Sequence, residues 1–157
     1  MRLTTFSDYC LRILIFVGVH DDRLCTIDEI CTAYGISRGH VMKAVYRLGQ
    51  LGYLDTLRGK NGGIRLAKEP SDIGVGDLIR HTEEDMALVE CFQAPGSGRC
   101  CIVGSCILRV ALAKALDEFL CALDRYTLAD LLGPRDRLAA LLSLDRKVPG
   151  RKSSVTN

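Results

Sequence analysis

Residues 26–67 carry the pattern that most restricts the fold of this chain. The sequence Thr26-x-x-Glu29 is a capping box, in which the hydroxyl and the carboxylate each bind a free N–H of the first helical turn. It predicts the start of a short helix. Gly35 then predicts a turn, and Ser37 predicts the cap of a second helix. Two helices joined by a glycine turn are typical of a helix-turn-helix.

The second helix of this motif has two faces of opposite character. Its apolar side chains recur at helical spacing and form an inner stripe: Val41, Val45, Leu48 and Leu51. Polar and basic side chains fall largely on the other side: Ser37, Arg38, His40, Lys43 and Arg47. A basic outer face predicts contacts in the major groove of double-stranded DNA. The solvated face of an ordinary core helix would give the same pattern, so this helix alone does not decide between the two interpretations.

A predicted β-hairpin follows directly and favours DNA binding. Residues 53–57 and 64–67 are predicted strands, and residues 58–63 are predicted to form a tight turn because Asn-Gly tolerates positive φ at both positions. The candidate DNA contacts on this hairpin are Arg58, Lys60, Asn61 and Arg65. A basic hairpin after a basic helix is typical of a wing, which reaches a phosphate or the minor groove while the helix lies in the major groove.

The charge distribution agrees with a polyanionic partner. The formal net charge is only +2, but residues 36–68 hold seven Lys and Arg side chains and one Asp, whereas residues 71–90 hold six acids and one Arg. Paired carboxylates, a nucleophile triad and a phosphate-binding loop are not evident in the sequence. We therefore expect a DNA-binding protein and not an enzyme.

Four of the eight cysteines cluster between Cys91 and Cys106. Eight residues separate Cys91 from Cys100, Cys101 follows Cys100 directly, and five residues separate Cys100 from Cys106. Zinc sites usually contain cysteine pairs with about two to four residues between them, so the spacing is a poor match for zinc. The two-residue spacing of bacterial ferredoxins is also absent from the sequence.

The chemistry of this segment nevertheless suits an anionic metal centre. Thiolates are soft ligands for iron–sulfur clusters and zinc. Gly96, Gly98 and Gly104 allow the backbone to approach closely, and Cys106 is expected at the positive end of a long helix. From the residues alone, an iron–sulfur cluster, a zinc ion and a thiol switch remain alternatives. The remaining cysteines are expected to be small buried hydrophobes: Cys10, Cys25, Cys31 and Cys121.

The helix expected over residues 105–126 predicts a symmetric dimer. Its apolar stripe is longer than one small domain needs, so we expect a partner helix from a second copy. The stripe consists of Leu108, Leu112, Ala115, Leu116, Phe119, Leu120 and Leu123. The predicted organisation is a winged helix-turn-helix domain at 1–70, a short helix and cysteine-rich loop at 71–106, a dimerisation helix with a short terminal helix at 107–132, and a flexible basic tail at 133–157.

The fold class expected from these patterns is mainly α-helical with a small β-hairpin wing, a winged helix-turn-helix followed by a long dimerisation helix. The apolar stretch at residues 11–19 is interrupted by Arg12 and is too short to span a bilayer. Because thiols stay reduced in the cytosol, clustered cysteines there more often bind metal or sense redox state. We therefore expect a cytoplasmic protein that has no membrane partner.

Three stretches of the sequence are similar to the NsrR and IscR family of winged-helix regulators. They are MRLTTFSDYCLRILI at the N-terminus, YGISRGHVMKAVYRLGQLGYLDTLRGKNGGIRL across the helix-turn-helix and wing, and the Cys-x5-Cys before the long helix. The stretch LDRYTLADLL resembles the NsrR branch, and the resemblance covers about residues 1–132. It implies a dimeric bacterial transcription factor that binds a palindromic operator and holds an iron–sulfur cluster.

By this resemblance the cluster ligands are Cys91, Cys100 and Cys106, and Asp8, of the same or the partner subunit, is a fourth ligand through oxygen. The gap after Cys91 is longer than is usual in the family, so Cys101 is an alternative to Cys100. The resemblance implies a 4Fe–4S cluster, with a 2Fe–2S cluster as the alternative. The IscR branch carries a His three residues after the last cysteine, and the Arg at this position of the chain disfavours that branch.

The function implied by the resemblance is that of a transcriptional repressor that senses nitric oxide. Nitrosylation of the cluster would release the operator. Two alternatives stay open at this point: a regulator of the same fold that senses iron or cluster supply, and a DNA-binding protein switched by zinc or by thiol oxidation.

Overall fold

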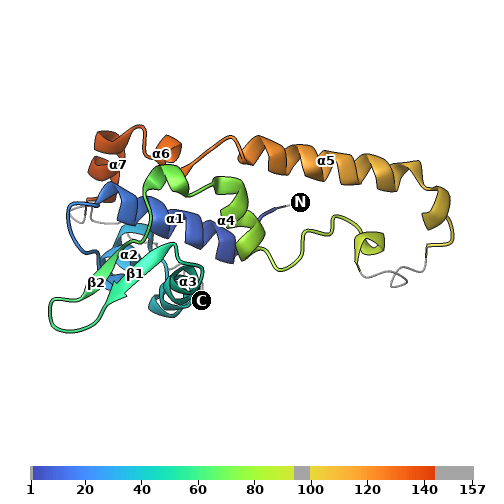
Figure 1. Cartoon of the computed structure of the whole chain (residues 1–157). Coiled ribbons are helices and arrows are strands. Elements are labelled where there is room, and N and C mark those ends of the chain that lie inside the picture. Colours follow the sequence, from blue (N-terminus) through green and yellow to red (C-terminus); the bar gives the residue numbers. More distant parts are fainter. Residues whose placement is uncertain (1, 94–99, 144–157) are drawn as a thin grey trace, which may run out of the picture.

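The computed structural model describes residues 2–93 and 100–143. The winged module comprises α1 (Thr5–Val19), α2 (Ile27–Tyr34), α3 (Arg38–Gln50), β1 (Leu54–Leu57) and β2 (Gly63–Leu66). The rest of the chain comprises α4 (Val75–Thr82), α5 (Ile107–Leu123), α6 (Leu128–Leu131) and α7 (Arg135–Leu142), with short 3₁₀ turns at Pro70–Asp72, Glu90–Phe92 and Val103–Ser105. Figure 1 shows the winged module, with α6 and α7 against it, at one end of the molecule and α5 extending away from it. The expected fold class is confirmed.

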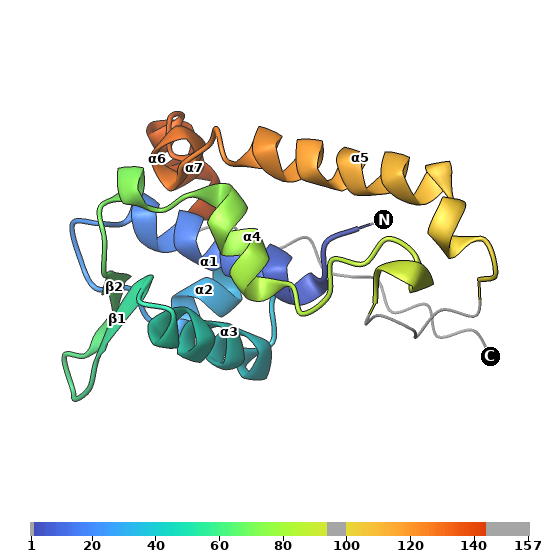
Figure 2. The ribbon, with the colours of Figure 1, turned by 45° about the vertical axis from the view of Figure 1, so that its right-hand side comes forward.

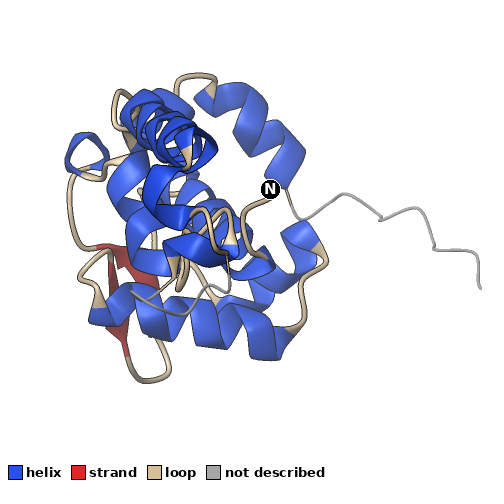
Figure 3. Cartoon of the chain, turned by 90° about the vertical axis from the view of Figure 1, so that its right-hand side faces the viewer, coloured by secondary structure: helices blue, strands red, loops and turns tan. Residues whose placement is uncertain are grey.

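Helix α1 lies at the centre of the hydrophobic core. Ile13, Leu14 and Phe16 are fully buried, and they belong to one apolar cluster with side chains of α2, α3 and β2. The same cluster includes side chains from later in the chain: Ile73, Leu78, Leu128, Leu132 and Leu142. The core is therefore shared between the winged module and the helices that follow it. The end-on view in Figure 3 shows the hairpin at the edge of this helical body.

The signals predicted for the helix-turn-helix are present in the structure. Glu29 N–H donates to Thr26 Oγ1 at 3.3 Å, and Thr26 N–H donates to Glu29 Oε2 at 2.7 Å, so the capping box is complete. Gly35 ends α2 with φ +65°, a left-handed conformation that favours glycine. Ser37 is the N-cap of α3, as predicted, but its hydroxyl makes no capping hydrogen bond and instead lies 2.8 Å from Nδ1 of His40.

Replacement of the Thr26 cap tests the contribution of this motif to stability. Thr26→Ala removes the side chain that satisfies a free N–H of α2, and we expect it to lower the free energy of unfolding by about 1 kcal/mol. Urea denaturation of the cluster-free protein measures the difference. Thr32→Ala is the matched control, because Thr32 lies in the interior of the same helix, where alanine is the better helix former. An equal loss in both variants would contradict the assigned role of the cap.

The wing is an antiparallel hairpin whose turn differs from the prediction. Its register pairs Leu54 with Leu66 and Leu57 with Gly63, so the connection is longer than a two-residue turn. Within the described chain, no residue other than glycine has positive φ, and the positive φ in this loop lies at Gly59, at +112°. The predicted use of Asn61-Gly62 as the left-handed pair is therefore wrong. A Cβ on Gly62 would lie 2.2 Å from the carbonyl oxygen of Leu57, so close backbone approach explains that glycine instead.

Helix α5 is only partly covered by the rest of the protomer. Within this helix, all of which the structure describes, no residue is buried, and Ile107 and Val110 are 83% and 66% exposed. Figures 1 and 2 show α5 extending past the winged module and not across its core. The helix is thus long and apolar, as predicted, and one protomer covers only part of its surface. Among the described helices, none is long and apolar enough to cross a membrane.

The predicted flexible tail at 133–157 is wrong for residues 135–142, which form α7. Leu142 is buried in the core, and Arg135 pairs with Asp21 and donates a 3.0 Å hydrogen bond to the carbonyl oxygen of Val19. This helix packs on α1 through contacts far apart in sequence, which explains why its local pattern looked weak. The remainder of the predicted tail, residues 144–157, lies outside the described residues.

Candidate functional site

The outer face of α3 presents the predicted DNA contacts to solvent. Every predicted contact on this helix is exposed: Ser37, Arg38, His40, Lys43 and Arg47. The inner face buries Val41, Ala44, Val45 and Leu48 against the core. The exposed and the buried face of α3 are therefore the two faces that its sequence predicted. In Figure 2, α3 lies along the lower side of the winged module and the hairpin extends beyond one end of it, an arrangement typical of a recognition helix and its wing.

Two of these basic side chains have partners within the chain. Arg38 forms an ion pair with Asp28 at the start of α2. The ammonium group of Lys43 lies 5.5 Å from the ring centroid of Phe6, a cation–π contact. Because these contacts are at the surface, each contributes little to stability, and a phosphate can compete for the same cations.

Sequence reasoning missed two further side chains on the same face. Met42 is 49% exposed and Tyr46 is 68% exposed, and the Tyr46 hydroxyl accepts a 3.0 Å hydrogen bond from Nε2 of Gln50. Their spacing was the available signal: Met42 follows Arg38 by four residues and Tyr46 follows Met42 by four, which places all three on one side of the helix. An apolar side chain here can contact a thymine methyl group, and a tyrosine hydroxyl can bind a phosphate.

The predicted wing contacts fall into two groups. Arg58, Lys60 and Asn61 are exposed in the connection between the strands. Arg65 is also exposed but stands on β2, opposite Asp55 in the register, and its guanidinium lies 3.2 Å from the Asp55 carboxylate. The structure thus brings the first three residues to the tip and holds the fourth on the stem.

The cysteine segment flanks the start of α5. Cys91 lies in the 3₁₀ turn Glu90–Phe92 and is half-buried, Cys100 and Cys101 are exposed, and Cys106 is the N-cap of α5. Gly96 and Gly98, predicted to let the backbone approach a cluster, lie outside the described residues, and Gly104 has open space around it. In residues 2–93 and 100–143, no three His, Cys, Asp or Glu side chains form a group able to hold a metal ion.

Two ends of this segment are nevertheless close together. The guanidinium of Arg109, one turn into α5 from Cys106, lies 5.9 Å from the ring centroid of Phe92, the residue after Cys91. The Cys106 side chain makes no capping hydrogen bond, so the first turn of α5 has free N–H groups beside a thiol. A thiol at the positive end of a 17-residue helix, in a segment with three further cysteines, is chemically suited to an anionic iron–sulfur cluster.

Asp8, the predicted oxygen ligand, belongs to the first turn of α1. Arg12 donates to its carboxylate through Nε at 3.0 Å and approaches it through a second nitrogen at 2.8 Å. The two side chains are 43% and 44% exposed, so the carboxylate is oriented and still accessible to a ligand. Among the residues that the structure describes, Asp8 does not belong to a group with the cysteines.

The other cysteines divide between core and surface. Cys10 and Cys25 are fully buried, and burial raises the pKa of the Cys10 thiol to about 12 and that of Cys25 to about 11. Both are buried, as predicted, and their thiols stay protonated at neutral pH. Cys31 is half-buried. Cys121 is exposed on α5, so its predicted burial is wrong for the protomer.

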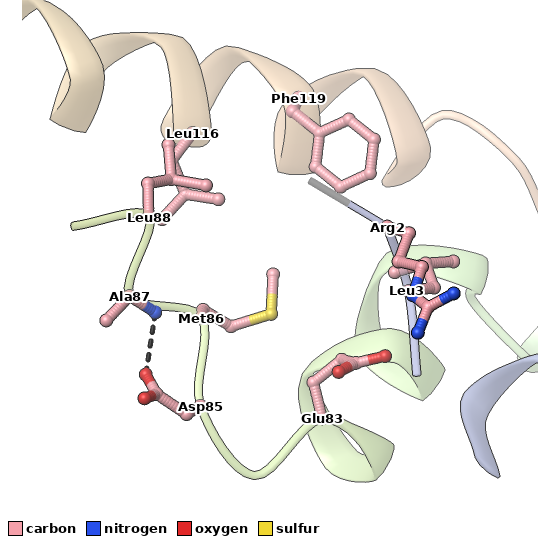
Figure 4. A pocket seen from close by; sticks show the side chains of 9 residues that line it. All are labelled: Arg2, Leu3, Glu83, Asp85, Met86, Ala87, Leu88, Leu116 and Phe119. Carbon is pink, nitrogen blue, oxygen red and sulfur yellow. Dashed lines mark hydrogen bonds between the residues drawn. The ribbon is translucent and has the colours of Figure 1, made fainter. Parts of the chain in front are cut away.

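A pocket of about 440 Å³ lies between the N-terminal residues, the segment that precedes Cys91, and α5. Figure 4 shows apolar side chains of α5 and of the segment before Cys91 facing the N-terminal residues. The lining consists of Arg2, Leu3, Glu83, Asp85, Met86, Ala87, Leu88, Leu116 and Phe119. The N-terminus of α1, the entry to the cysteine segment and α5 thus meet at one place.

Comparison with known proteins identifies the class of protein that this fold and site define. Residues 3–134 match the Rrf2 family, described as an iron-dependent transcriptional regulator. The fold is shared with T. potens IscR, with a TM-score of 0.69 and 24% identity over 88% of this chain and 90% of that one. It is also shared with CymR, the global cysteine regulator of B. subtilis, with a TM-score of 0.63 and 26% identity over 83% and 95%.

The chain belongs to the Rrf2 family, and it is accordingly a DNA-binding transcriptional regulator and not an enzyme. Within the family, it is similar to the HTH-type transcriptional regulators NsrR. The identity is 51% with NsrR of Geobacillus kaustophilus, over 90% of this chain and 97% of that protein. It is 45% with NsrR of Bacillus subtilis, over 92% and 99%. The expected family is confirmed.

Proposed function

We propose that this protein is a dimeric repressor that binds a palindromic operator and senses nitric oxide through an iron–sulfur cluster. The observation that carries the proposal is the thiol-rich segment at the positive end of α5, in a chain that is 51% identical to an NsrR regulator. Because it acts on DNA, we assign it to the cytoplasm. The cluster is of the 4Fe–4S type in this proposal, and a 2Fe–2S cluster is the alternative.

Cys91, Cys100 and Cys106 would hold the cluster, and when bound it would supply iron that reacts with nitric oxide. The N–H groups of the first turn of α5 would stabilise its negative charge beside Cys106. Asp8 would supply the fourth, oxygen ligand from the partner subunit. A carboxylate is a harder ligand than a thiolate and binds iron in a sulfide environment less firmly. The bond from iron to Asp8 would therefore be lost more easily than a bond to a cysteine.

The chain's own residues would convert loss of this fourth ligand into release of DNA. Asp8 belongs to α1, and the core side chains of α1 pack directly on α3. If Asp8 is fixed to the partner's cluster, the two recognition helices keep one separation, which operator half-sites of fixed spacing require. Once the carboxylate is free, it returns to its pair with Arg12, and the separation is no longer fixed. Full switching needs about 5.5 kcal/mol of differential stabilisation across the dimer.

The cluster and its response are tested together by a visible absorption spectrum. Protein purified without oxygen is expected to be brown and to contain iron and sulfide, and stoichiometric nitric oxide is expected to bleach or shift the absorption band. Brown protein that is indifferent to nitric oxide would support sensing of iron or cluster supply. Colourless protein, with zinc or without metal, would support the zinc- or thiol-switched alternative.

The exposed wing tip is proposed to contact phosphate. Lys60→Ala should weaken binding to all duplex sequences by a similar factor and reduce the slope of log K against log salt by about one, because one fewer counterion is released. Fluorescence anisotropy with labelled duplexes at several salt concentrations measures both effects. Lys114→Ala, on the exposed surface of α5, is the matched control and should leave the slope unchanged. A sequence-selective loss in Lys60→Ala would mean that this lysine contacts a base.

A further inference from the structure

His81 on α4 makes a side-chain contact with the base of the wing. Its Nδ1 lies 2.8 Å from the hydroxyl of Tyr53, and the two ring centroids are 6.0 Å apart. Tyr53 is 4% exposed, so this hydrogen bond is shielded from water on the tyrosine side. A hydrogen bond between side chains 28 residues apart is a specific tie between α4 and the winged module.

Tyr53 is itself fixed to both DNA-binding elements. Its N–H donates to the carbonyl oxygen of Leu48 in α3 at 2.9 Å. Its own carbonyl oxygen accepts from the N–H of Ala67, directly after β2, at 3.0 Å. A displacement of Tyr53 would therefore shift the end of the recognition helix and the stem of the wing together.

The neighbouring residue, Arg80, binds the C-terminal end of α5. Its guanidinium donates two hydrogen bonds of 2.7 Å to the carboxylate of Asp124, the C-cap residue of α5. The N–H of Val75 also donates to the carbonyl oxygen of Tyr126 at 2.9 Å. A Cβ on Gly76 would overlap the position of the Asp124 carboxylate, so the glycine leaves room for the pairing of Arg80 with Asp124. Helix α4 is thus attached to the end of α5 by side-chain and backbone contacts, and Figure 2 shows it between α5 and α3.

The same helix leads into the cysteine segment. After α4 ends at Thr82, the Glu83 carboxylate accepts hydrogen bonds from the N–H and the hydroxyl of Thr4, at 2.8 and 3.1 Å. The chain then continues to Cys91. Helix α4 accordingly contacts the end of the long helix and the DNA-binding elements, and the chain connects it through residues 83–90 to the cysteine segment.

We propose that the contacts Arg80–Asp124 and His81–Tyr53, together called the α4 link, transmit the position of α5 and the cysteine segment to the recognition helix and wing. Arg80 and His81 are positioning residues in this proposal, because they act through α4 and touch neither cluster nor DNA. The inference rests on the proposed function, since it concerns how the signal travels. The two contacts act in series, so breaking either one should interrupt the signal.

The test compares operator affinity of holo-protein with that of cluster-free protein and of protein treated with nitric oxide. The probe is a labelled duplex selected by the wild-type holo-protein from a random pool. Tyr53→Phe and Asp124→Asn are each expected to reduce the ratio of these affinities about fivefold, the usual effect of losing one hydrogen bond. The double variant should reduce it no further than the larger single effect, because contacts in series are not additive.

Two matched controls separate signal transmission from stability. Tyr34→Phe removes a hydroxyl from a half-buried tyrosine that packs on Phe16 of α1, and it should leave the ratio unchanged. Asp77→Asn removes a carboxylate that is also 3.3 Å from Arg80 but lies within α4, and it too should leave the ratio unchanged. Amide hydrogen exchange in cluster-free protein adds a readout that needs no iron. Residues 54–66 should exchange faster in Asp124→Asn than in Asp77→Asn, although Asp124 contacts α4 and not the wing.

Each outcome bears on the proposal. If the wild-type protein responds to its cluster and Tyr53→Phe keeps the full ratio, the α4 link is wrong and the proposed function stands. Additive losses in the double variant would also overturn the α4 link, because the two contacts would then act independently. If wild-type protein binds the operator equally well with and without its cluster, the proposed function is wrong. The α4 link is then wrong as well, because no signal exists for it to transmit.

Discussion

Cys100→Ala is expected to leave the protein unable to hold an iron–sulfur cluster, whereas Cys101→Ala is expected to retain it. Both thiols are exposed in the structure and adjacent in sequence, so the two variants carry the same chemical change at neighbouring positions. Removing one of three thiolate ligands opens a second corner of the cluster to water and to loss of iron. Iron and sulfide analysis per protomer, after purification without oxygen, measures the difference directly.

The opposite result would reassign a ligand without removing the site. If Cys101→Ala loses the cluster and Cys100→Ala keeps it, the five-residue spacing before Cys106 is the wrong guide. Cys121→Ala serves as a control for general thiol loss, because Cys121 is exposed on α5 outside the segment. If both Cys100→Ala and Cys101→Ala retain iron, neither thiol is individually required for the cluster, and the assignment of Cys100 as a ligand is contradicted.

A double variant, Leu108→Asp with Ala115→Asp, is expected to convert the dimer to a monomer and weaken operator binding about 100-fold or more. Both residues are exposed and lie seven positions apart on one side of α5, so the substitutions bury no charge within a protomer. They place carboxylates where we propose that the partner helix packs. The loss in affinity follows because two linked half-site contacts become two independent ones.

Sedimentation analysis and operator titration measure these two effects on the same samples. Lys114→Asp adds an acid to a different side of α5 and should remain dimeric. A dimer that survives in the Leu108→Asp/Ala115→Asp variant would show that another surface holds the protomers together. Unchanged circular dichroism in the variant would establish that the protomer itself is folded.

The winged module was predictable because its signals are local. The capping box at Thr26, the left-handed Gly35 and the two faces of α3 each depend on residues within a turn or two of one another. Hydrophobic periodicity also predicted the long helix at residues 105–126, and α5 spans Ile107–Leu123. The comparisons with known proteins confirm the class that these signals indicated.

The features that were missed depend on contacts between distant residues. Helix α7 is held by Arg135 pairing with Asp21 and by burial of Leu142, and neither contact is visible in its own sequence. The turn of the wing takes its left-handed residue at Gly59, because the register of the strands leaves a longer connection than Asn-Gly alone requires. Neither Arg80–Asp124 nor Tyr53–His81 follows a local pattern.

The candidate site was predictable in chemistry and less so in geometry. The residue types of the cysteine segment suit a soft-metal centre, although their spacing matches neither zinc sites nor ferredoxins, and the basic face of α3 is exposed as predicted. Met42 and Tyr46 were missed because exposure of an apolar or aromatic side chain is decided by packing and not by the residue type. A ligand that comes from a second subunit, as proposed for Asp8, has no signature in a single sequence.

The most direct test of the central claim is the affinity of the holo-protein for operator DNA before and after nitric oxide. The account predicts tight, specific binding by the brown protein and loss of that binding as nitric oxide is added, with the change following the bleaching of the visible absorption. Binding that stays unchanged while the cluster reacts would contradict it.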